Sequence, residues 1–459
     1  MTLSLVARPF IFLYQLLSRI FWSGLNKKPI WRLILNFWIG FSTVFIWLLI
    51  FKNAGLIPHS IRPPIHVKLP VIMDHYMFSN MVGSVFMILC LSSFSYLLFV
   101  KYYRPNNCQN LTKYLPILNK RESIEIREES ISSESSNSSD LEDHFGLDSF
   151  ALDSTTSTIE PLSFIEPEDH VPPLEFFRTL SEAEITQRES ETNAKIIDHL
   201  RATHSYQPRN CWYFAPPLLF FLSWGILNID YWFKDPINTQ KDLLAWFSYV
   251  ICHITVPIVT AVWLYVFHAP GAVKLYGLTL GIQNICGVLT HLVFPNAPPW
   301  FVHMYGENKE ANYEMPGYAA GLIRVDIALG THLHSKGFHA SPIVFGAIPS
   351  LHSAMAVMTF FFVSYYARWT AVKVASFLFV VIQWWATIYL DHHWRVDLLI
   401  GLSYALFWFT IVKNVRFGLN RVDEQFIKSR LRFDFAHGST MGMRVFRNTR
   451  LQKFFDPLA

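Results

Sequence analysis

Eight apolar stretches dominate the sequence, and each is close to the length that a helix needs to cross the hydrocarbon core of a bilayer, about 20 residues. They cover roughly residues 34–51, 79–100, 211–229, 243–267, 271–293, 353–368, 371–390 and 398–414. The composition agrees, because 52% of the residues are hydrophobic and only 16% are charged, against about 25% charged in soluble domains. The sequence therefore predicts an all-α polytopic membrane protein with about eight transmembrane helices.

The same composition argues against several other classes of protein. A net charge of +4 is small for a nucleic-acid-binding protein, so no nucleic acid partner is expected. The five cysteines do not occur at metal-ligand spacing, and three of them lie inside apolar runs, which argues against a disulfide framework. The shorter segment 9–23 carries Arg19 and is more typical of an interfacial amphipathic helix than of a span.

A segment of different composition separates the second stretch from the third. Residues 121–160 are rich in serine and glutamate and include the run ESISSESSNSSDLED. Such a composition cannot bury enough apolar surface to fold, so disorder is expected across 105–205. A regulatory or tethering role and an inert insertion both remain open for this loop. We expect four parts: an N-terminal region 1–104 with two spans, the disordered cytosolic loop 105–205, a six-helix catalytic core 206–415 and a basic cytosolic tail 416–459.

Basic side chains flank both ends of the chain and set its expected orientation. They are Arg8, Arg19, Lys27, Lys28 and Arg32 near the N-terminus, and Lys413, Arg416, Arg421, Lys428, Arg430 and Arg432 in the tail. Because positively charged flanks stay in the cytosol, and because eight spans return the chain to its starting side, both termini are expected there. Residues 294–345 and 391–397 then fall on the opposite, lumenal side.

Two short motifs at that lumenal face carry the candidate chemistry. The first, Pro349-Ser-Leu-His352, stands at the start of the sixth stretch. The second, Asp391-His-His393-Trp-Arg-Val-Asp397, follows the seventh. His352 and His393 are 41 positions apart, which is about two spans of 20 residues, so the chain crosses the membrane and returns. Both motifs are therefore expected at the same membrane face.

The spacing inside the motifs is typical of an oriented nucleophile or base. His393 and Asp397 are four residues apart and would share one face of a helix that begins near them. The carboxylate can accept a hydrogen bond from one imidazole nitrogen and leave the other nitrogen free to attack. Ser350 and the amides of Leu351 and His352 follow a proline where a helix could start, and such a start binds phosphate through its free N–H groups.

Other interpretations of these histidines stay open at this point. A single histidine at a membrane interface is usually only a polar residue at a wet boundary, and a lone H-x-x-x-D pattern is similarly weak. Two such motifs on one face favour a function, as ionisable residues at membrane depth do in general. A metal site is the other specific interpretation, since Asp391, His392, His393 and His352 could supply ligands.

Polar residues elsewhere are less specific. Arg324, close to Asp326 in the lumenal loop, could clamp a phosphate, and an ordinary loop ion pair explains it equally well. His253, inside the fourth stretch, could face a polar cavity, although a satisfied core histidine is the more frequent case. The segment Pro295-Asn-Ala-Pro-Pro-Trp-Phe301 is expected to shape a lipid entrance or to anchor at the interface.

At these motifs the chain resembles the type 2 phosphatidic acid phosphatase superfamily. Pro349-Ser-Leu-His352 and His393-x-x-x-Asp397 match its second and third signatures, which implies a phosphatase-like helical core within 206–415. Its first signature, a Lys and an Arg-Pro spaced along one segment, is not found in the sequence. Ala386-Thr387 stands where the third signature normally opens with Ser-Arg. These departures argue against the basic phosphate clamp of a phosphatase and against simple phosphate hydrolysis.

The same departures occur in the inositol phosphorylceramide synthase branch of the superfamily, and the chain resembles that branch further. The matching segments are Pro298-Pro-Trp300, Ser341–Ala347 and Trp384-Trp385. Similarity to the fungal inositolphosphotransferases extends over Phe51–Pro58, Lys241–Val250, Ala320–Asp326, Asp391–His393 and Phe454–Ala459. This resemblance covers most of the chain except the loop, and it implies a Golgi membrane location with the active site facing the lumen.

The resemblance implies that phosphoinositol is transferred from phosphatidylinositol to a hydroxyl of mannosyl-inositol-phosphorylceramide, with diacylglycerol released. His393 would be the nucleophile that forms a phosphohistidine diester, and Asp397 would orient it. His352 would protonate the departing diacylglycerol oxygen and then deprotonate the acceptor hydroxyl. No metal or cofactor is expected, because the charge on a diester is modest.

Arg324, together with Ser350 and Leu351 at the helix start, would stabilise the phosphoryl oxygens. Three alternatives remain open at the level of sequence. The nearest is an inositol phosphorylceramide synthase that uses ceramide as its acceptor. The second is a lipid phosphate phosphatase, and the third is a transporter or scaffold in which the histidines are structural.

Overall fold

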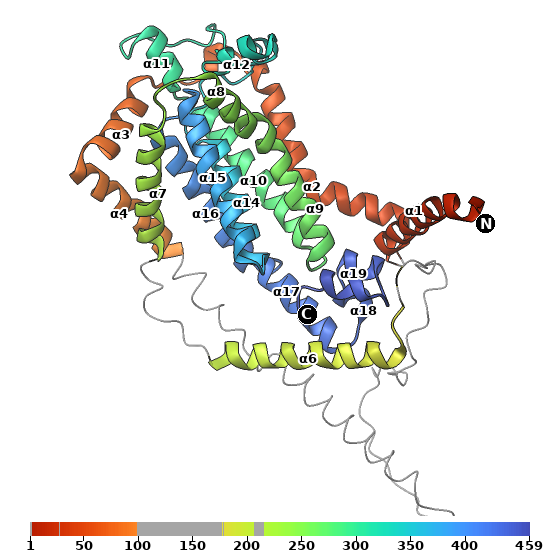
Figure 1. Ribbon diagram of the computed structural model, residues 1–459. Coiled ribbons are helices and arrows are strands. Elements are labelled where there is room, and N and C mark those ends of the chain that lie inside the picture. The colour runs from red at the N-terminus through yellow and green to blue at the C-terminus, as the bar shows by residue number, and fades with distance from the viewer. Residues whose placement is uncertain (1, 27, 99–176, 178, 206–214) are drawn as a thin grey trace, which may run out of the picture.

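The computed structural model describes residues 2–26, 28–98, 177, 179–205 and 215–459, and over these residues it contains helices and isolated bridges but no strand. A bundle of helices forms its centre (Figure 1). The bundle consists of α2 (Ile30–Asn53), α9 (His253–Phe267), α10 (Ala272–Val293), α14 (Leu351–Tyr366), α15 (Thr370–Tyr389) and α16 (Arg395–Asn414). Helices α3 (Lys68–Ser79), α4 (Met81–Leu98) and α7 (Ala215–Trp232) flank one side. The all-α fold expected from the sequence is confirmed.

Five helical segments in the described part of the chain are long and apolar enough to cross a membrane, and α3 with α4 makes a sixth if the pair is counted as one bent span. The five are Ile30–Leu56, Thr239–Phe267, Ala272–Val293, Thr370–Tyr389 and Arg395–Leu431. All eight expected stretches are helical where the structure describes them, but eight spans are not confirmed.

Three of the eight stretches differ from a simple span for physical reasons. α14 has 16 residues, so it is only about 24 Å long at 1.5 Å per residue. α7 has 18 residues and carries Asn228 and Asp230, which lower its hydropathy. α3 and α4 meet at an angle of 103°. A length prediction based on apolar runs counts all three as spans, because it registers neither the bend nor the polar residues.

Helices α2 and α10 pack closely along their lengths. A side chain on Gly277 would place its Cβ 2.8 Å from the carbonyl oxygen of Gly40, closer than real contacts allow. The Thr43 hydroxyl donates to the Leu278 carbonyl across the same interface, at 3.1 Å. Small residues that let two backbones approach, with a hydroxyl between them, are the usual way in which helices associate in lipid.

Shorter helices cover one end of the bundle, which we call the α11–α12 end (Figure 1). They are α8 (Thr239–Trp246), the π-helical segment η7 (Phe247–Cys252), α11 (Pro299–Tyr305), α12 (Leu322–Leu329) and α13 (Leu333–His339). This end is tied to the turn between α15 and α16, because the Trp300 and Gly321 N–H groups donate to the Asp391 and Leu390 carbonyls. The covering loops therefore meet the bundle at the second sequence motif.

The opposite end of the bundle carries both termini. α17 (Leu419–Leu431), α18 (Phe435–Gly438), α19 (Met441–Val445) and η8 (Arg450–Phe455) form the tail. α1 (Thr2–Leu25), expected to be interfacial, is a helix that docks on this tail through buried Arg19, whose Nε donates to the Val445 carbonyl at 2.6 Å. The N-terminal helix and the tail thus pack against each other at this end of the bundle.

Helix α6 (Glu182–Ser205) lies within 105–205, where the sequence predicted disorder. Its start is capped reciprocally, since the Ser181 N–H donates to the Glu184 carboxylate and the Glu184 N–H donates to the Ser181 hydroxyl. Ile196 and Leu200 are buried against Ile427 and Leu431 of α17. Tertiary packing of this kind stabilises a polar helix that composition alone does not favour. Most of the remaining loop, including 121–160, lies outside the described residues.

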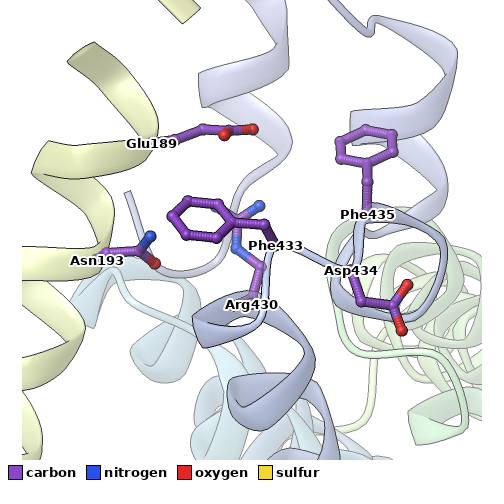
Figure 2. A pocket seen from close by; sticks show the side chains of 6 residues that line it. All are labelled: Glu189, Asn193, Arg430, Phe433, Asp434 and Phe435. Atoms are coloured by element: carbon purple, nitrogen blue, oxygen red, sulfur yellow. The ribbon is translucent and has the colours of Figure 1, made fainter. Parts of the chain in front are cut away.

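Figure 2 shows the contact between α6 and the tail, with Glu189 and Asn193 of α6 near Arg430, Phe433 and Phe435. Burial raises the pKa of Glu189, and the nearby charge of Arg430 offsets part of that rise. The cavity between these side chains measures only about 10 Å³, room for no more than one water molecule. The side chains of α6 and the tail pack against each other here, and the cavity between them is too small for a substrate.

Candidate active site

The Pro349-Ser-Leu-His352 motif begins helix α14 at the α11–α12 end of the bundle. Ser350 is fully buried and caps the helix, because its hydroxyl accepts from the Ser353 N–H at 3.3 Å. Its own N–H donates to the Asp397 carbonyl at 3.1 Å. The Ser353 hydroxyl donates to the Leu398 carbonyl at 2.7 Å and accepts from the Trp384 indole at 2.8 Å. These bonds hold α14, α15 and α16 together at the level of both motifs.

His393 and Asp397 adopt the arrangement expected from their spacing. His393 Nδ1 lies 3.4 Å from an Asp397 carboxylate oxygen and 3.2 Å from the Ala347 carbonyl. Asp397 is fully buried, and the same oxygen accepts from the Trp394 N–H at 2.8 Å, which fixes the start of α16. With two acceptors around Nδ1, that nitrogen carries the proton, and Nε2 keeps its lone pair.

The rings of His352 and His393 lie close together, as we expected from the two helices that separate them in the sequence. Their ring centroids are 5.6 Å apart and their planes are inclined by 61°. His352 comes from the first turn of α14 and His393 from just before α16, so helix packing holds both rings in place. His393 is 8% exposed. The structure therefore brings together a desolvated, oriented imidazole and a second imidazole that can exchange protons with an attached group.

Two further side chains pack on His352. The ring of Tyr249 stacks on it with centroids 4.2 Å apart, and the ring of His253 lies 4.3 Å away. Nδ1 of His253 is buried without a hydrogen-bond partner in the described part of the chain. The satisfied core histidine favoured by the sequence argument therefore does not describe His253. Tyr249 was not singled out from the sequence at all.

A local irregularity of the backbone brings these two rings to the site. Residues Phe247–Cys252 form a π-helical turn between α8 and α9. Such turns insert one extra residue into a helix and occur mostly at functional sites. Here the turn carries Tyr249, and His253 begins α9 directly after it. A π-helical turn has no characteristic pattern of apolar residues. The sequence therefore did not reveal Tyr249.

Asp391 and His392, which precede His393 in the second motif, contact other side chains. The Asp391 carboxylate accepts from Lys234 at 2.5 Å and lies 3.3 Å from His303. Although burial opposes ionisation, the hydrogen bond from His303 and the charge of Lys234 hold its pKa below the ordinary value. His392 stacks between Tyr249 and Phe338, and burial lowers its pKa to about 3. His392 is therefore a neutral ring that packs behind the site.

The metal interpretation needs a cluster of ligands. Among the described residues, no group of three or more His, Cys, Asp or Glu side chains is arranged to hold a metal ion.

Arg324 forms an ion pair with Asp242, and no contact between Arg324 and His352 or His393 is found in the part of the chain that the structure describes. Its Nε donates to Asp242 at 2.7 Å, and its guanidinium lies 5.3 Å from the centre of the Tyr389 ring. Nη2 is buried without a hydrogen-bond partner among the residues described. Asp326 has a different role, since its carboxylate accepts from Thr331 and Ser335 and caps α13.

The sequence argument also missed a buried ion pair that holds the second motif. Arg395 donates to the Asp74 carboxylate of α3 at 2.7 Å, and its guanidinium lies 4.3 Å from the centre of the Phe78 ring. The other Asp74 oxygen accepts from the Val396 N–H at 3.1 Å. Breaking a buried pair of this kind costs about 3–5 kcal/mol of stability. Asp74 therefore anchors the start of α16, although it is 321 residues away from Arg395 in the chain.

Comparison with known proteins gives one match over nearly the whole chain. Inositolphosphotransferase 1 of Saccharomyces cerevisiae is 31% identical over an alignment that covers 95% of this chain and 97% of that protein. The family model of the PAP2 superfamily matches residues 222–411, which contain both motifs. No solved structure matches the chain significantly.

Inositol phosphorylceramide synthases match a smaller part of the chain. The catalytic subunit aur1 of Schizosaccharomyces pombe is 36% identical over 41% of this chain and 44% of that protein. The synthase of Candida albicans is 42% identical over 38% of this chain and 36% of that protein. These relatives thus share a core with the chain, whereas the first match extends over both ends.

Proposed function

The chain belongs to the inositolphosphotransferase family of the PAP2 superfamily, and we propose that it moves phosphoinositol from phosphatidylinositol to mannosyl-inositol-phosphorylceramide. It is a membrane-embedded phosphotransferase of sphingolipid biosynthesis. The observation that carries the mechanism is the position of His393, with Nδ1 between two oxygen acceptors and its ring 5.6 Å from His352. This is the arrangement that activates an imidazole as a nucleophile.

In the first half of the reaction, Nε2 of His393 attacks the phosphorus of phosphatidylinositol. A phosphorus–nitrogen bond forms, the bond to the diacylglycerol oxygen breaks, and protonated His352 gives its proton to that oxygen. The ring of His393 becomes positively charged, and the Asp397 carboxylate stabilises this charge across 3.4 Å. The products of this half are free diacylglycerol and a phosphohistidine in which the phosphoinositol group is bonded to Nε2 of His393.

In the second half, neutral His352 removes the proton of the acceptor hydroxyl, whose oxygen attacks the same phosphorus. The phosphorus–nitrogen bond breaks, and the electron pair returns to Nε2 of His393. Water would compete with the acceptor, so a desolvated site is required. The low exposure of His393, 8%, and the full burial of Asp397 suit this requirement.

Ser350, Leu351 and Arg324 are the proposed ligands of the phosphoryl oxygens. Leu351 begins α14, where helix N–H groups can face an anion, and Ser350 would contribute its hydroxyl, because its own N–H donates to the Asp397 carbonyl. Asp242 holds Arg324 through Nε, which leaves the unpartnered Nη2 available for an oxygen. The charge of the diester would then be shared between helix dipole and guanidinium.

We infer a Golgi membrane location with the site on the lumenal side, and a catalytic core within 206–415 between the N-terminal region 1–104 and the tail 416–459. Support for the orientation comes from the basic flanks and from the docking of α1 on the tail, which keeps both termini on one face. The catalytic histidines lie at the opposite end of the bundle, near α11 and α12.

A transfer assay with purified full-length protein tests the acceptor. Phosphatidylinositol labelled in its headgroup is supplied with mannosyl-inositol-phosphorylceramide or with ceramide. We expect label to enter the mannosylated acceptor at least about tenfold faster than ceramide, because a site that hydrogen-bonds hydroxyls discriminates strongly against a molecule that lacks them. Preference for ceramide, release of inorganic phosphate from phosphatidate, or no turnover with any acceptor would each contradict the proposal.

The stacking of Tyr249 on His352 gives a second test. We expect Tyr249→Leu to lower kcat by roughly 10–100-fold, because His352 loses the ring that fixes its orientation and a small misplacement of a catalytic group is costly. Tyr249→Phe keeps the ring and should retain nearly the full rate in the same assay. Equal loss in both variants would show that the hydroxyl, rather than the stacked ring, matters.

A further inference from the structure

A cavity of about 330 Å³ lies at the α11–α12 end of the bundle. Its walls come from four stretches of the sequence: the turn at residues 55–62, the end of α10 and the following turn at 291–295, the loop at 313–316 and the segment 339–345. The volume is within the range of small-molecule sites, about 300–1,000 Å³. None of the steps proposed above uses this cavity.

The cavity and the catalytic histidines share one wall. His291 lines the cavity, and its Nε2 is 2.8 Å from the carbonyl oxygen of Pro349, the residue that begins the first motif. Phe345 also lines the cavity, and two residues later the Ala347 carbonyl contacts His393 Nδ1. The cavity therefore adjoins the chain segment that carries the first motif and the Ala347 contact to His393.

The side chains around the cavity suit a polyhydroxylated ligand. Glu314, His59 and His339 are all exposed, and together they offer both hydrogen-bond acceptors and donors. Hydroxyl groups need both kinds, because each of them can donate and accept. The ring of Tyr313, whose centroid is 5.8 Å from that of the His59 ring, adds a flat apolar surface. A wholly apolar lipid chain would leave these polar groups without partners.

A fixed cation completes the lining. Nε and Nη2 of Arg62 donate to the carbonyls of Ile57 and Ala54, at 3.0 and 2.9 Å, and its guanidinium lies 5.0 Å from the centre of the Tyr313 ring. These contacts hold the guanidinium rigidly and leave Nη1 outside every observed hydrogen bond of the described residues. A guanidinium placed in this way is suited to bind a phosphate oxygen.

We propose that this cavity binds the sugar-phosphate headgroup of the acceptor, a glycosylated inositol phosphodiester. Glu314 and His59 bind its hydroxyl groups, and Arg62 binds its phosphodiester. The inference rests on the proposed function and names the part of the molecule that selects the acceptor. Residues 55–62 lie outside the 222–411 core that the PAP2 superfamily model matches. Residues 55–62 thus add one wall of the cavity to the core that the superfamily shares. Such an addition suits recognition of the acceptor, because the acceptor is the substrate that differs between inositolphosphotransferases and inositol phosphorylceramide synthases.

Steady-state kinetics of Glu314→Ala and His59→Ala in mixed micelles test this assignment. We expect each variant to raise KM for mannosyl-inositol-phosphorylceramide by at least about tenfold, with kcat and KM for phosphatidylinositol close to wild type, the pattern of lost ground-state binding. Glu310→Ala is the matched control, because Glu310 is an exposed glutamate of the same loop that does not line the cavity.

The outcomes separate this inference from the proposed function. If wild-type protein transfers phosphoinositol to the mannosylated acceptor but both variants keep its KM unchanged, the cavity is not the headgroup site, and the proposed function stands. If KM for phosphatidylinositol rises instead, the cavity serves the donor and the assignment is overturned. Absence of transfer by the wild-type protein would overturn the proposed function itself.

Discussion

Replacing His393 with alanine is expected to lower phosphoinositol transfer by at least about 10⁴-fold, the size of effect that follows loss of a catalytic nucleophile. Alanine has no atom that can form the bond to phosphorus, and the neighbouring His352 is held by Tyr249 and His253 in an orientation suited to proton transfer. The measurement is the initial rate of label transfer from phosphatidylinositol to the mannosylated acceptor. Labelled phosphoinositol should also remain bound to denatured wild-type protein and be absent from the variant.

The control for this variant is His437→Ala. His437 is an exposed histidine of α18 at the opposite end of the bundle, and its Nδ1 lies 2.9 Å from the Asp434 carboxylate. It should retain wild-type transfer and the same amount of protein in membranes. If His393→Ala keeps more than about a hundredth of the wild-type rate, or if the covalent label persists in it, a different residue accepts the phosphoinositol group.

The meeting of His352 and His393 could be predicted from the sequence, because the number of helices between the two motifs decides which end of the bundle each motif reaches. The chain leaves the first motif along α14 and returns along α15, two helices of 16 and 20 residues, so both motifs reach the same end of the bundle. The pairing of His393 with Asp397 was predictable for a similar reason, since a four-residue spacing on a helix places two side chains on one face. Both arguments use only local geometry and the thickness of a bilayer.

The remaining parts of the site depend on contacts that local rules do not contain. Tyr249 and His253 reach His352 through a π-helical turn, and Asp74 reaches Arg395 across 321 residues. Arg324 could equally have been a clamp or a loop ion pair, and the partner that the structure gives it, Asp242, is 82 residues away. Tertiary packing decides each of these contacts, and a single sequence carries no record of it.

Composition misled the prediction of disorder for a related reason. The polar helix α6 has few apolar residues, so composition alone assigns it to the disordered loop. Ile196 and Leu200, four residues apart, form a narrow apolar stripe that only becomes meaningful when α17 supplies Ile427 and Leu431. The capping pattern at Ser181 and Glu184 was the local signal that could have revealed the start of this helix.

Changing Asp397 to asparagine is expected to lower transfer by about 10³–10⁴-fold while leaving the fold intact. The amide oxygen of asparagine can still accept from the Trp394 N–H and cap α16, as the carboxylate does at 2.8 Å. A neutral amide, however, cannot balance the positive charge that His393 acquires when it binds phosphorus. The oxygen that accepts from Trp394 is also the one that lies 3.4 Å from His393 Nδ1, so an amide turned the other way would lose the cap and would favour the tautomer in which Nε2 carries the proton and cannot attack.

A stability measurement separates this electrostatic effect from a structural one. Asp397→Asn should show a melting temperature close to wild type, whereas Asp397→Ala loses the cap as well, which costs about 0.5–2 kcal/mol. Asp434→Asn, at an exposed carboxylate that caps α18, is the matched control and should transfer normally. If Asp397→Asn transfers phosphoinositol at the wild-type rate, the carboxylate charge plays no part, and His393 must be oriented by the Ala347 carbonyl alone.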